Sequence, residues 1–152
     1  MTETGWRIVP LDEARMTQWA ALRQQLWPHH GIAAHLQEGG ELLTNAGLNA
    51  FLALDEQDQA VGFADAALRH DYVNGCESSP VVYLEGVYVQ PASRRRGLAR
   101  ALIAQVAQWG RKLGCRELAS DAAIDNLASQ RMHERLGFAE TERVVFFKKA
   151  LG

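Results

Sequence analysis

Three arginines followed by a glycine, at residues 94–97, form the part of the sequence best suited to bind an anion. They follow the apolar run 87–89, which predicts a strand, and they lead into a segment with the apolar spacing of a helix. The N-terminus of a helix carries free N–H groups and the positive end of the helix dipole, so it suits a phosphate group. Gly97 and Ala99 leave room for a bulky anion to touch the backbone. The loop therefore predicts a phosphate site, and the alternative is a solvated basic turn.

The spacing of this loop differs from that of two common nucleotide-binding motifs. It lacks the Gly-Lys-Ser/Thr of a P-loop and the first glycines of the Rossmann fingerprint. Arg94, Gly97 and Ala99 instead follow the pattern R-x-x-G-x-A, which resembles the acetyl-CoA pyrophosphate loop of the GNAT acetyltransferase superfamily. The resemblance implies that acetyl-CoA is the cosubstrate. The residues that it implies for binding acetyl-CoA in this region are Val87, Tyr88, Val89, Arg94, Arg95, Arg96, Gly97, Leu98 and Ala99.

A second segment that resembles the superfamily lies at residues 126–138. Asn126 opens a predicted helix and Gly137 ends it. In the superfamily this helix lies along the pantetheine arm of CoA, which implies contacts from Asn126, Ala128 and Ser129. The alternative for Asn126 is a helix N-cap, and the two roles are compatible.

His133 stands where the superfamily usually carries a tyrosine, four residues before the Gly-Phe pair that follows the helix. That tyrosine protonates the departing thiolate of CoA. A histidine can donate a proton near neutral pH, so the resemblance implies a catalytic general acid at His133. The alternative is that His133 only packs or lines the pocket.

Several further segments resemble one subgroup, the chromosomal aminoglycoside 6′-N-acetyltransferases of Gram-negative bacteria. Loops outside the CoA motif are more informative about the acceptor than the CoA motif itself. The subgroup implies direct transfer of acetyl from acetyl-CoA to the 6′-amine of an aminoglycoside antibiotic, without an acyl-enzyme, and hence drug resistance. The alternatives are a GNAT enzyme that acts on a polyamine or a protein N-terminus, and a non-catalytic acyl-CoA-binding module. The matching segments are residues 26–30, 72–75, 79–81, 84–89, 119–123 and 140–149.

Glu85 and Asp121 are the acidic pair that this subgroup implies. Glu85 lies on the predicted strand before the arginine loop, and Asp121 follows the next strand. An aminoglycoside is a polycation, so carboxylates suit its site, and its ammonium must lose a proton before it can attack a thioester. Both residues are therefore expected to bind the substrate and to act in catalysis. The alternatives are a buried Glu85 paired with an arginine and an Asp121 that is an ordinary turn residue.

Aromatic residues at loop boundaries are candidates for the walls of the acceptor site. Trp27 and Tyr72 are expected to stack on sugar rings, whereas Trp19 and Trp109 are expected in the core. No metal is expected, because the other histidines lack ligand spacing. Cys76 and Cys115 form neither a metal pattern nor a disulfide framework.

The elements that must position these residues alternate between strands and helices. Apolar periodicity and turn residues predict the order β-α-α-β-β-β-α-β-α-β-β, with a nearly unbroken apolar strand at residues 81–89 and a final pair of strands at 138–141 and 143–149. This is an α/β (α+β) class. It matches the GNAT fold, a mixed and mostly antiparallel sheet with a central, splayed parallel strand pair and flanking helices. The whole chain, residues 1–152, is expected to form one domain.

Composition excludes several other classes of protein. The net charge of −2 argues against a nucleic-acid binder, and no run is long enough to cross a membrane. The first residues lack the apolar stretch of a signal peptide, and the cysteines are expected to stay reduced, so we expect a cytoplasmic protein. The apolar run 144–147 would form an exposed edge that needs a cover, which predicts a homodimer.

Overall fold

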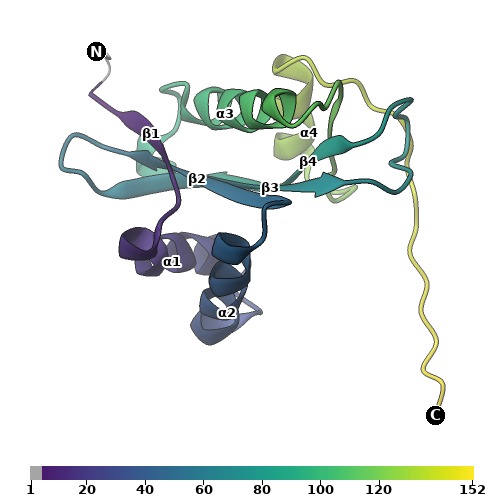
Figure 1. Cartoon of the computed structure of the whole chain (residues 1–152), viewed down its shortest axis with the longest axis horizontal. Coiled ribbons are helices and arrows are strands. Elements are labelled where there is room, and N and C mark those ends of the chain that lie inside the picture. The colour runs from purple at the N-terminus through teal and green to yellow at the C-terminus, as the bar shows by residue number, and fades with distance from the viewer. Residues whose placement is uncertain (1–4) are drawn as a thin grey trace.

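The computed structural model describes residues 5–152 and has a mixed sheet with helices on both faces (Figure 1). The strand order in the described chain is β1-β2-β3-β4-β5, and the pairing is antiparallel except between β4 and β5, which are parallel. This is the predicted mixed α/β class. The elements are β1 (Arg7–Pro10), η1 (Glu13–Arg15), α1 (Met16–Leu26), α2 (Gly31–Thr44), β2 (Leu48–Leu54), β3 (Ala60–Arg69), β4 (Val81–Val89), η2 (Pro91–Ser93), α3 (Leu98–Lys112), β5 (Leu118–Ser120) and α4 (Leu127–Arg135).

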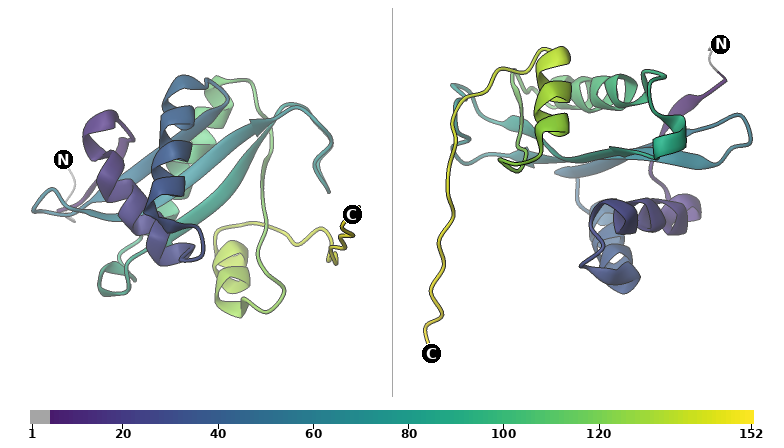
Figure 2. Two further views of the ribbon diagram at one scale, coloured as in Figure 1. Left: turned by 90° about the horizontal axis from the view of Figure 1, so that it is seen from below. Right: turned by 180° about the vertical axis from the view of Figure 1, so that it is seen from behind.

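Two helical layers enclose the sheet, α1 and α2 on one face and α3 and α4 on the other (Figures 1 and 2). On the α3 face, Leu98, Leu102 and Val106 recur every four residues and are almost fully buried. On the opposite face the core is built around Trp19 and Phe63, which have no exposed surface. The expectation that Trp19 is a core residue is confirmed, whereas Trp109 is only partly buried and packs against the core on the α3 face.

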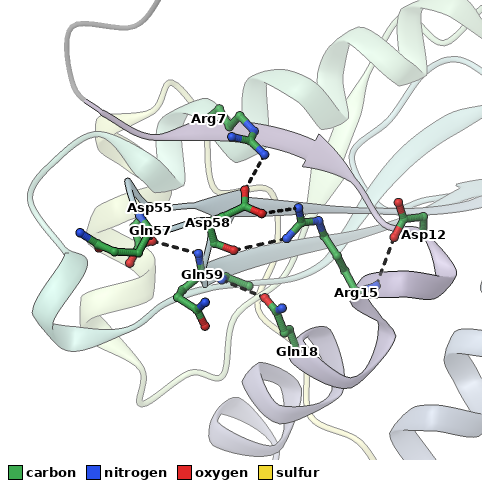
Figure 3. A network of polar contacts seen from close by, with 9 residues as sticks. Arg7, Asp12, Arg15, Gln18, Asp55, Gln57, Asp58 and Gln59 are labelled. Atoms are coloured by element: carbon green, nitrogen blue, oxygen red, sulfur yellow. Dashed lines mark hydrogen bonds and ion pairs between the residues drawn. The ribbon is translucent and has the colours of Figure 1, made fainter.

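The N-terminal strand is fastened to the β2–β3 turn by a polar network on the surface (Figure 3). The Asp58 carboxylate pairs with Arg7 at 2.5 Å and with Arg15 at 3.0 Å. Asp12 caps the following 3-10 helix by accepting a hydrogen bond from the Arg15 backbone N–H. These contacts join β1, η1 and the β2–β3 turn, and Glu56 in the same turn lies 3.6 Å from Arg96 of the arginine loop.

The final pair of strands predicted from the sequence is wrong for this structure. Among the described residues no strand follows α4, and residues 139–152, which we call the C-terminal arm, run away from the body as an extended segment (Figures 1 and 2). Thr141 and Glu142 bond to Asn74 at the base of the arm, and the residues beyond are exposed. The apolar pattern of the arm is that of a strand, but a strand forms only where a neighbouring strand accepts its hydrogen bonds.

The structure also bears on the membrane expectation. In residues 5–152 every helix is too short or too polar to span a bilayer. Residues 1–4, which belong to the segment expected to lack a signal peptide, lie outside the described residues.

Candidate active site

Strand β4 has an open edge over its second half. The short strand β5 pairs only with Val82, Tyr83 and Leu84, so β4 continues to Val89 without a partner on that side among the described strands. The N–H of Gln90 donates to the Val61 carbonyl on the β3 side, at 2.8 Å. Because backbone groups alternate in direction along a strand, the N–H groups of Val87 and Val89 point toward the open side. Two backbone donors therefore line the gap beyond the end of β5.

A bulge at Glu85 begins this open stretch. Asp65 pairs with Gly86 and Ala66 pairs with Leu84, which leaves Glu85 as the extra residue on β4. The Glu85 side chain is 37% exposed, so the interpretation of Glu85 as a buried acid is wrong. It does pair with an arginine, since Arg69 Nη2 lies 2.9 Å from Glu85 Oε2. The bulge thus turns a carboxylate outward at the point where β4 loses its second neighbour.

The arginine loop leads into α3 through two residues with positive φ. Arg95 has φ +66° and Gly97 has φ +80°, and Gly97 is the N-cap of α3. Within residues 5–152 no side chain caps this helix, and a Cβ built on Gly97 would have nothing within 4 Å. The N–H groups of the first turn therefore open onto free space, as a phosphate site requires.

The residues predicted for the loop divide into three kinds. Arg95, Arg96 and Gly97 are exposed around the helix N-terminus. Arg94 instead turns back, and its Nε donates to the Val89 carbonyl at 2.8 Å, so it fastens the loop to the end of β4. Leu98 is 2% exposed, so its side chain belongs to the core and only its backbone can meet a ligand.

The two predicted carboxylates belong to one connected cluster. The Arg69 guanidinium, which pairs with Glu85, also lies 3.5 Å from the centre of the Tyr83 ring. The Tyr83 hydroxyl donates to Asp121 Oδ2 at 2.5 Å. Burial, followed by the hydrogen bond to Asp121, raises the pKa of Tyr83 above its ordinary value, so the hydroxyl keeps its proton and remains a donor.

Arg69 and Tyr83 are functional candidates that the sequence analysis missed. Tyr83 stands two residues before Glu85, and Arg69 is the last residue of β3. Because β3 and β4 are antiparallel and Arg69 pairs with Val81, Arg69 and Tyr83 both lie near Glu85 and Asp121. The only signal in the sequence is an arginine at the end of a predicted strand that neighbours the strand containing Glu85.

Trp27 lies over β4 beside the bulge. A Cβ built on Gly86 would come within 2.4 and 2.6 Å of two Trp27 ring carbons, so only glycine lets the indole lie this close to the strand. The ring also packs edge-on against Phe63, with centroids 5.9 Å apart. Trp27 is therefore partly a core residue and partly a wall next to Glu85. The other predicted wall residue, Tyr72, is 79% exposed.

A buried ion pair lies behind Trp27. The Arg23 guanidinium is 4.9 Å from the centre of the Trp27 ring, and its Nε is 3.0 Å from Asp65 Oδ2, an ion pair without the angle of a hydrogen bond. Trp19 Nε1 donates to the other oxygen of Asp65 at 2.8 Å. Burial raises the pKa of Asp65 to about 7, against the opposing effects of Arg23 and Trp19.

Helix α4 faces the end of β5. The Asn126 side chain accepts a hydrogen bond from the Ser129 N–H at 3.1 Å, which confirms the N-cap interpretation. Ala128 is exposed and Ser129 is half-buried on the first turn. His133, on the second turn, bonds to Ser120 Oγ through Nε2 and to the Ser129 carbonyl through Nδ1. These contacts fix α4 to the strand that ends beside Asp121.

This arrangement suits the transfer of a group carried by a phosphorylated ligand to an amine. The open N-terminus of α3 fits a pyrophosphate, and the free edge of β4 fits an amide-containing chain such as pantetheine. The carboxylates of Glu85 and Asp121, which we call the acidic cluster, fit a cation. In the described part of the chain no three His, Cys, Asp or Glu side chains gather as metal ligands, and Cys76 and Cys115 are free.

Comparison with known proteins agrees with this geometry. The profile of the Acetyltransferase (GNAT) family matches residues 11–138. The aminoglycoside N(6′)-acetyltransferase type 1 of Salmonella enteritidis is 52% identical over 142 residues, covering 93% of this chain and 97% of that protein. The enzyme of the same name from Serratia marcescens is 52% identical over 145 residues, covering 95% and 99%.

Solved structures are similar over the same length. The enzyme AAC(6′)-Iy in complex with the bisubstrate analogue CoA-S-monomethyl-acetylneamine has a TM-score of 0.92 and 50% identity, covering 95% of this chain and 98% of that chain. The aminoglycoside 6′-N-acetyltransferase AAC(6′)-Ih from Acinetobacter baumannii has a TM-score of 0.92 and 47% identity, covering 97% and 100%.

Proposed function

The chain belongs to the GNAT family of acetyltransferases, and we propose that it is an aminoglycoside 6′-N-acetyltransferase that uses acetyl-CoA. The observation that best supports an aminoglycoside as the acetyl acceptor is the match to a structure whose ligand joins CoA to an aminoglycoside, at 50% identity over 95% of this chain. Enzymes of this name also share 52% of their residues with the chain over nearly its full length. The geometry supports the same reaction, because an anion loop and an acidic cluster flank one strand edge.

Each part of the site has a role in this proposal. The N–H groups of Val87 and Val89 bind the thioester carbonyl and the pantetheine arm. Residues 94–99 hold the pyrophosphate, and Asn126, Ala128 and Ser129 lie along pantetheine. These roles use the free strand edge and the uncapped helix start described above.

The acidic cluster receives the amine. Glu85 anchors the cationic substrate, and Asp121 accepts a proton from the 6′-ammonium so that the free amine can attack the thioester. The nitrogen lone pair forms the C–N bond, the C–S bond breaks with its electron pair on sulfur, and the nitrogen loses a second proton. The sulfur gains a proton in exchange, so the products are the amide and the thiol of CoA. The transfer is direct, without an acyl-enzyme. Trp27 and Tyr72 supply walls for the sugar rings.

The proposed product has one positive charge fewer than the antibiotic. Binding to ribosomal RNA depends on such charges, so acetylation weakens it and confers drug resistance. A steady-state assay with acetyl-CoA and kanamycin, tobramycin or spermidine tests the proposal. Faster turnover with an aminoglycoside supports it. Turnover with spermidine alone supports an enzyme for another amine, and binding of acetyl-CoA without turnover supports a binding module.

A homodimer is part of the proposal, and the C-terminal arm supports it. Four consecutive apolar residues, Val144, Val145, Phe146 and Phe147, are exposed by 54 to 92% in the isolated chain. In the described chain β5 is an edge strand with one neighbour, so a sheet edge is open to an added strand. A second copy of the chain supplies both a matching arm and a matching edge, as a two-fold interface requires.

Light scattering after size-exclusion chromatography tests the dimer. The wild-type chain is expected to elute with twice the monomer mass, and a variant with Phe146→Lys and Phe147→Lys is expected to elute as a monomer. A wild-type monomer at micromolar concentration contradicts the proposal.

A cytoplasmic location also belongs to the proposal. The free thiols of Cys76 and Cys115 fit a reducing compartment, and acetyl-CoA is a cytoplasmic metabolite. Fractionation of cells that express the chain tests this location.

A further inference from the structure

The carboxylate proposed to anchor the acceptor is paired with a cation of the chain itself. Arg69 Nη2 donates a hydrogen bond to Glu85 Oε2 over 2.9 Å. Within residues 5–152 this is the one hydrogen bond of the Arg69 side chain. A guanidinium and a substrate ammonium group both bind a carboxylate through charged N–H donors. A cationic acceptor and Arg69 therefore compete for the same partner.

The pair of Arg69 and Glu85 is exposed enough to exchange its partners. The Arg69 side chain is 43% exposed and the Glu85 side chain is 37% exposed, so solvent screens their attraction and breaking the pair costs little. Asp65, four residues earlier on β3, is paired with Arg23, and the side chains of that pair are only 7% and 10% exposed. Of these two ion pairs, only the one at Glu85 can exchange a partner with a ligand.

The Arg69 guanidinium has a second contact that does not depend on Glu85. It lies 3.5 Å from the centre of the Tyr83 ring, whose face attracts a positive charge. The Tyr83 side chain is buried, and its hydroxyl is bonded to Asp121, so the ring stays in place. Arg69 can therefore release Glu85 and keep its contact with the ring.

We propose that Arg69 is an internal competitor of the acceptor at Glu85. The guanidinium holds Glu85 until an ammonium group of the acceptor displaces it, and it returns to Glu85 when the product leaves. One ion pair is broken for each one that forms, so Arg69 limits the affinity for the acceptor and favours release of the product.

This displacement rests on the proposed function, in which Glu85 anchors a cationic acceptor. It involves a different amine from the one that reacts beside Asp121. The acceptors affected are therefore those with two or more amines, of which one is acetylated and another displaces Arg69.

Two variants of Arg69 separate competition from a structural role. Arg69→Gln removes the charge and keeps an amide N–H that can donate to Glu85, whereas Arg69→Lys keeps the charge. In calorimetry with neamine, an aminoglycoside with several amines, we expect Arg69→Gln to lower the Kd about fivefold, the upper end for one exposed ion pair. Arg69→Lys is expected to stay within about twofold of the wild type.

Two outcomes of this titration contradict the competition. If Arg69 only positioned Glu85, Arg69→Gln would bind neamine no better than the wild type or more weakly. A Kd for acetyl-CoA that changes as much as the Kd for neamine would show a long-range effect of charge. Either result overturns the proposal.

Glu85→Gln tests whether the gain depends on the carboxylate. Without the charge of Glu85 the two cations have nothing to compete for. In this background we therefore expect Arg69→Gln to change the Kd of neamine less than about twofold, which makes the two substitutions non-additive. A fivefold gain here as well would show general repulsion between Arg69 and the acceptor, and would overturn the competition.

A spectroscopic measurement follows the guanidinium itself. In protein with ¹⁵N-labelled arginine, neamine is expected to shift the Arg69 Nε resonance, which Arg69→Lys assigns by its loss. An unshifted resonance in the neamine complex of the wild type overturns the displacement. If neither the wild type nor Arg69→Gln binds neamine, the proposed acceptor fails and the competition fails with it. If the wild type acetylates neamine and Arg69→Gln binds it no more tightly, only the competition fails.

Discussion

The Tyr83 hydroxyl donates a hydrogen bond of 2.5 Å to the Asp121 carboxylate, and so joins the strand before the arginine loop to the loop after β5. Glu85, two residues beyond Tyr83, is held differently, by the guanidinium of Arg69. One acid has a neutral donor as its partner and the other has a full positive charge. We therefore expect the two carboxylates to have unequal roles.

Neutral amides at the two positions should separate these roles. Asp121→Asn removes the proposed proton acceptor and is expected to lower kcat for kanamycin about 10²–10⁴-fold, with partial recovery as the pH rises and free amine forms without help. Glu85→Gln leaves Asp121 in place and is expected to raise KM while kcat changes little. Near wild-type kcat/KM in both variants at neutral pH would remove the acidic cluster from the reaction.

A side chain at Gly97 should weaken the binding of acetyl-CoA by more than its effect on the stability of the fold explains. Gly97→Val places a side chain at the open N-terminus of α3, where a Cβ now meets nothing within 4 Å. We expect the KM for acetyl-CoA to rise at least about tenfold, which corresponds to ~1.4 kcal/mol of lost contact.

Gly114, past the other end of α3, provides the matched control. Its φ of +86° is close to the +80° of Gly97, and a Cβ there also meets nothing within 4 Å. Gly114→Val therefore carries similar backbone strain, about 1–2 kcal/mol, without touching the loop. Equal changes of KM in the two variants would show that strain, and not phosphate binding, explains the effect.

Much of this site could be predicted from the sequence because its signals are local. The arginine loop, the glycine before α3 and the asparagine cap of α4 each depend on neighbouring residues, and the structure places all three as helix starts. The contact of Arg69 with Glu85 could not be predicted in the same way. It depends on a one-residue bulge in the β3–β4 register, which no periodicity reveals.

The C-terminal arm shows a second limit of local reasoning. The run 144–147 has the side chains of a strand, and the sequence analysis therefore expected one. A strand also needs a sheet edge, and the arm leaves the body at Thr141 and Glu142, which bond to Asn74. The amino-acid pattern does not say which edge, in which copy of the chain, the segment can reach.

Salt should weaken substrate binding if the acidic cluster recognises a polycation. Raising the salt from 0.1 M to 1 M shortens the screening length from about 10 Å to about 3 Å. We expect the Kd of kanamycin, measured by calorimetry, to rise by about an order of magnitude over this range. The variant Glu85→Gln should show a shallower dependence, because one interacting charge is gone. Affinity that is insensitive to salt in the wild type would contradict an acidic acceptor site.

Two aspartates should give stability opposite dependences on pH. Burial raises the pKa of Asp65 to about 7, so the folded chain keeps a proton that the unfolded chain releases near pH 4. Since the unfolded state then binds fewer protons, the contribution of Asp65 to the free energy of unfolding falls as the pH rises from about 4 to about 7, by about 1 kcal/mol per pH unit. Asp65→Asn removes this titration, so the difference in unfolding free energy between wild type and variant, measured by urea denaturation, should shrink over that range.

The control is Asp58, whose hydrogen bond to Arg15 is the largest of the effects that lower its pKa. The contribution of Asp58 is present above its ordinary pKa and is lost only as the pH falls below about 4, so Asp58→Asn should leave the slope between pH 4 and 7 unchanged. Parallel curves for wild type and Asp65→Asn across this range would show that Asp65 is ionised in the folded chain, and that its pairing with Arg23 outweighs its burial.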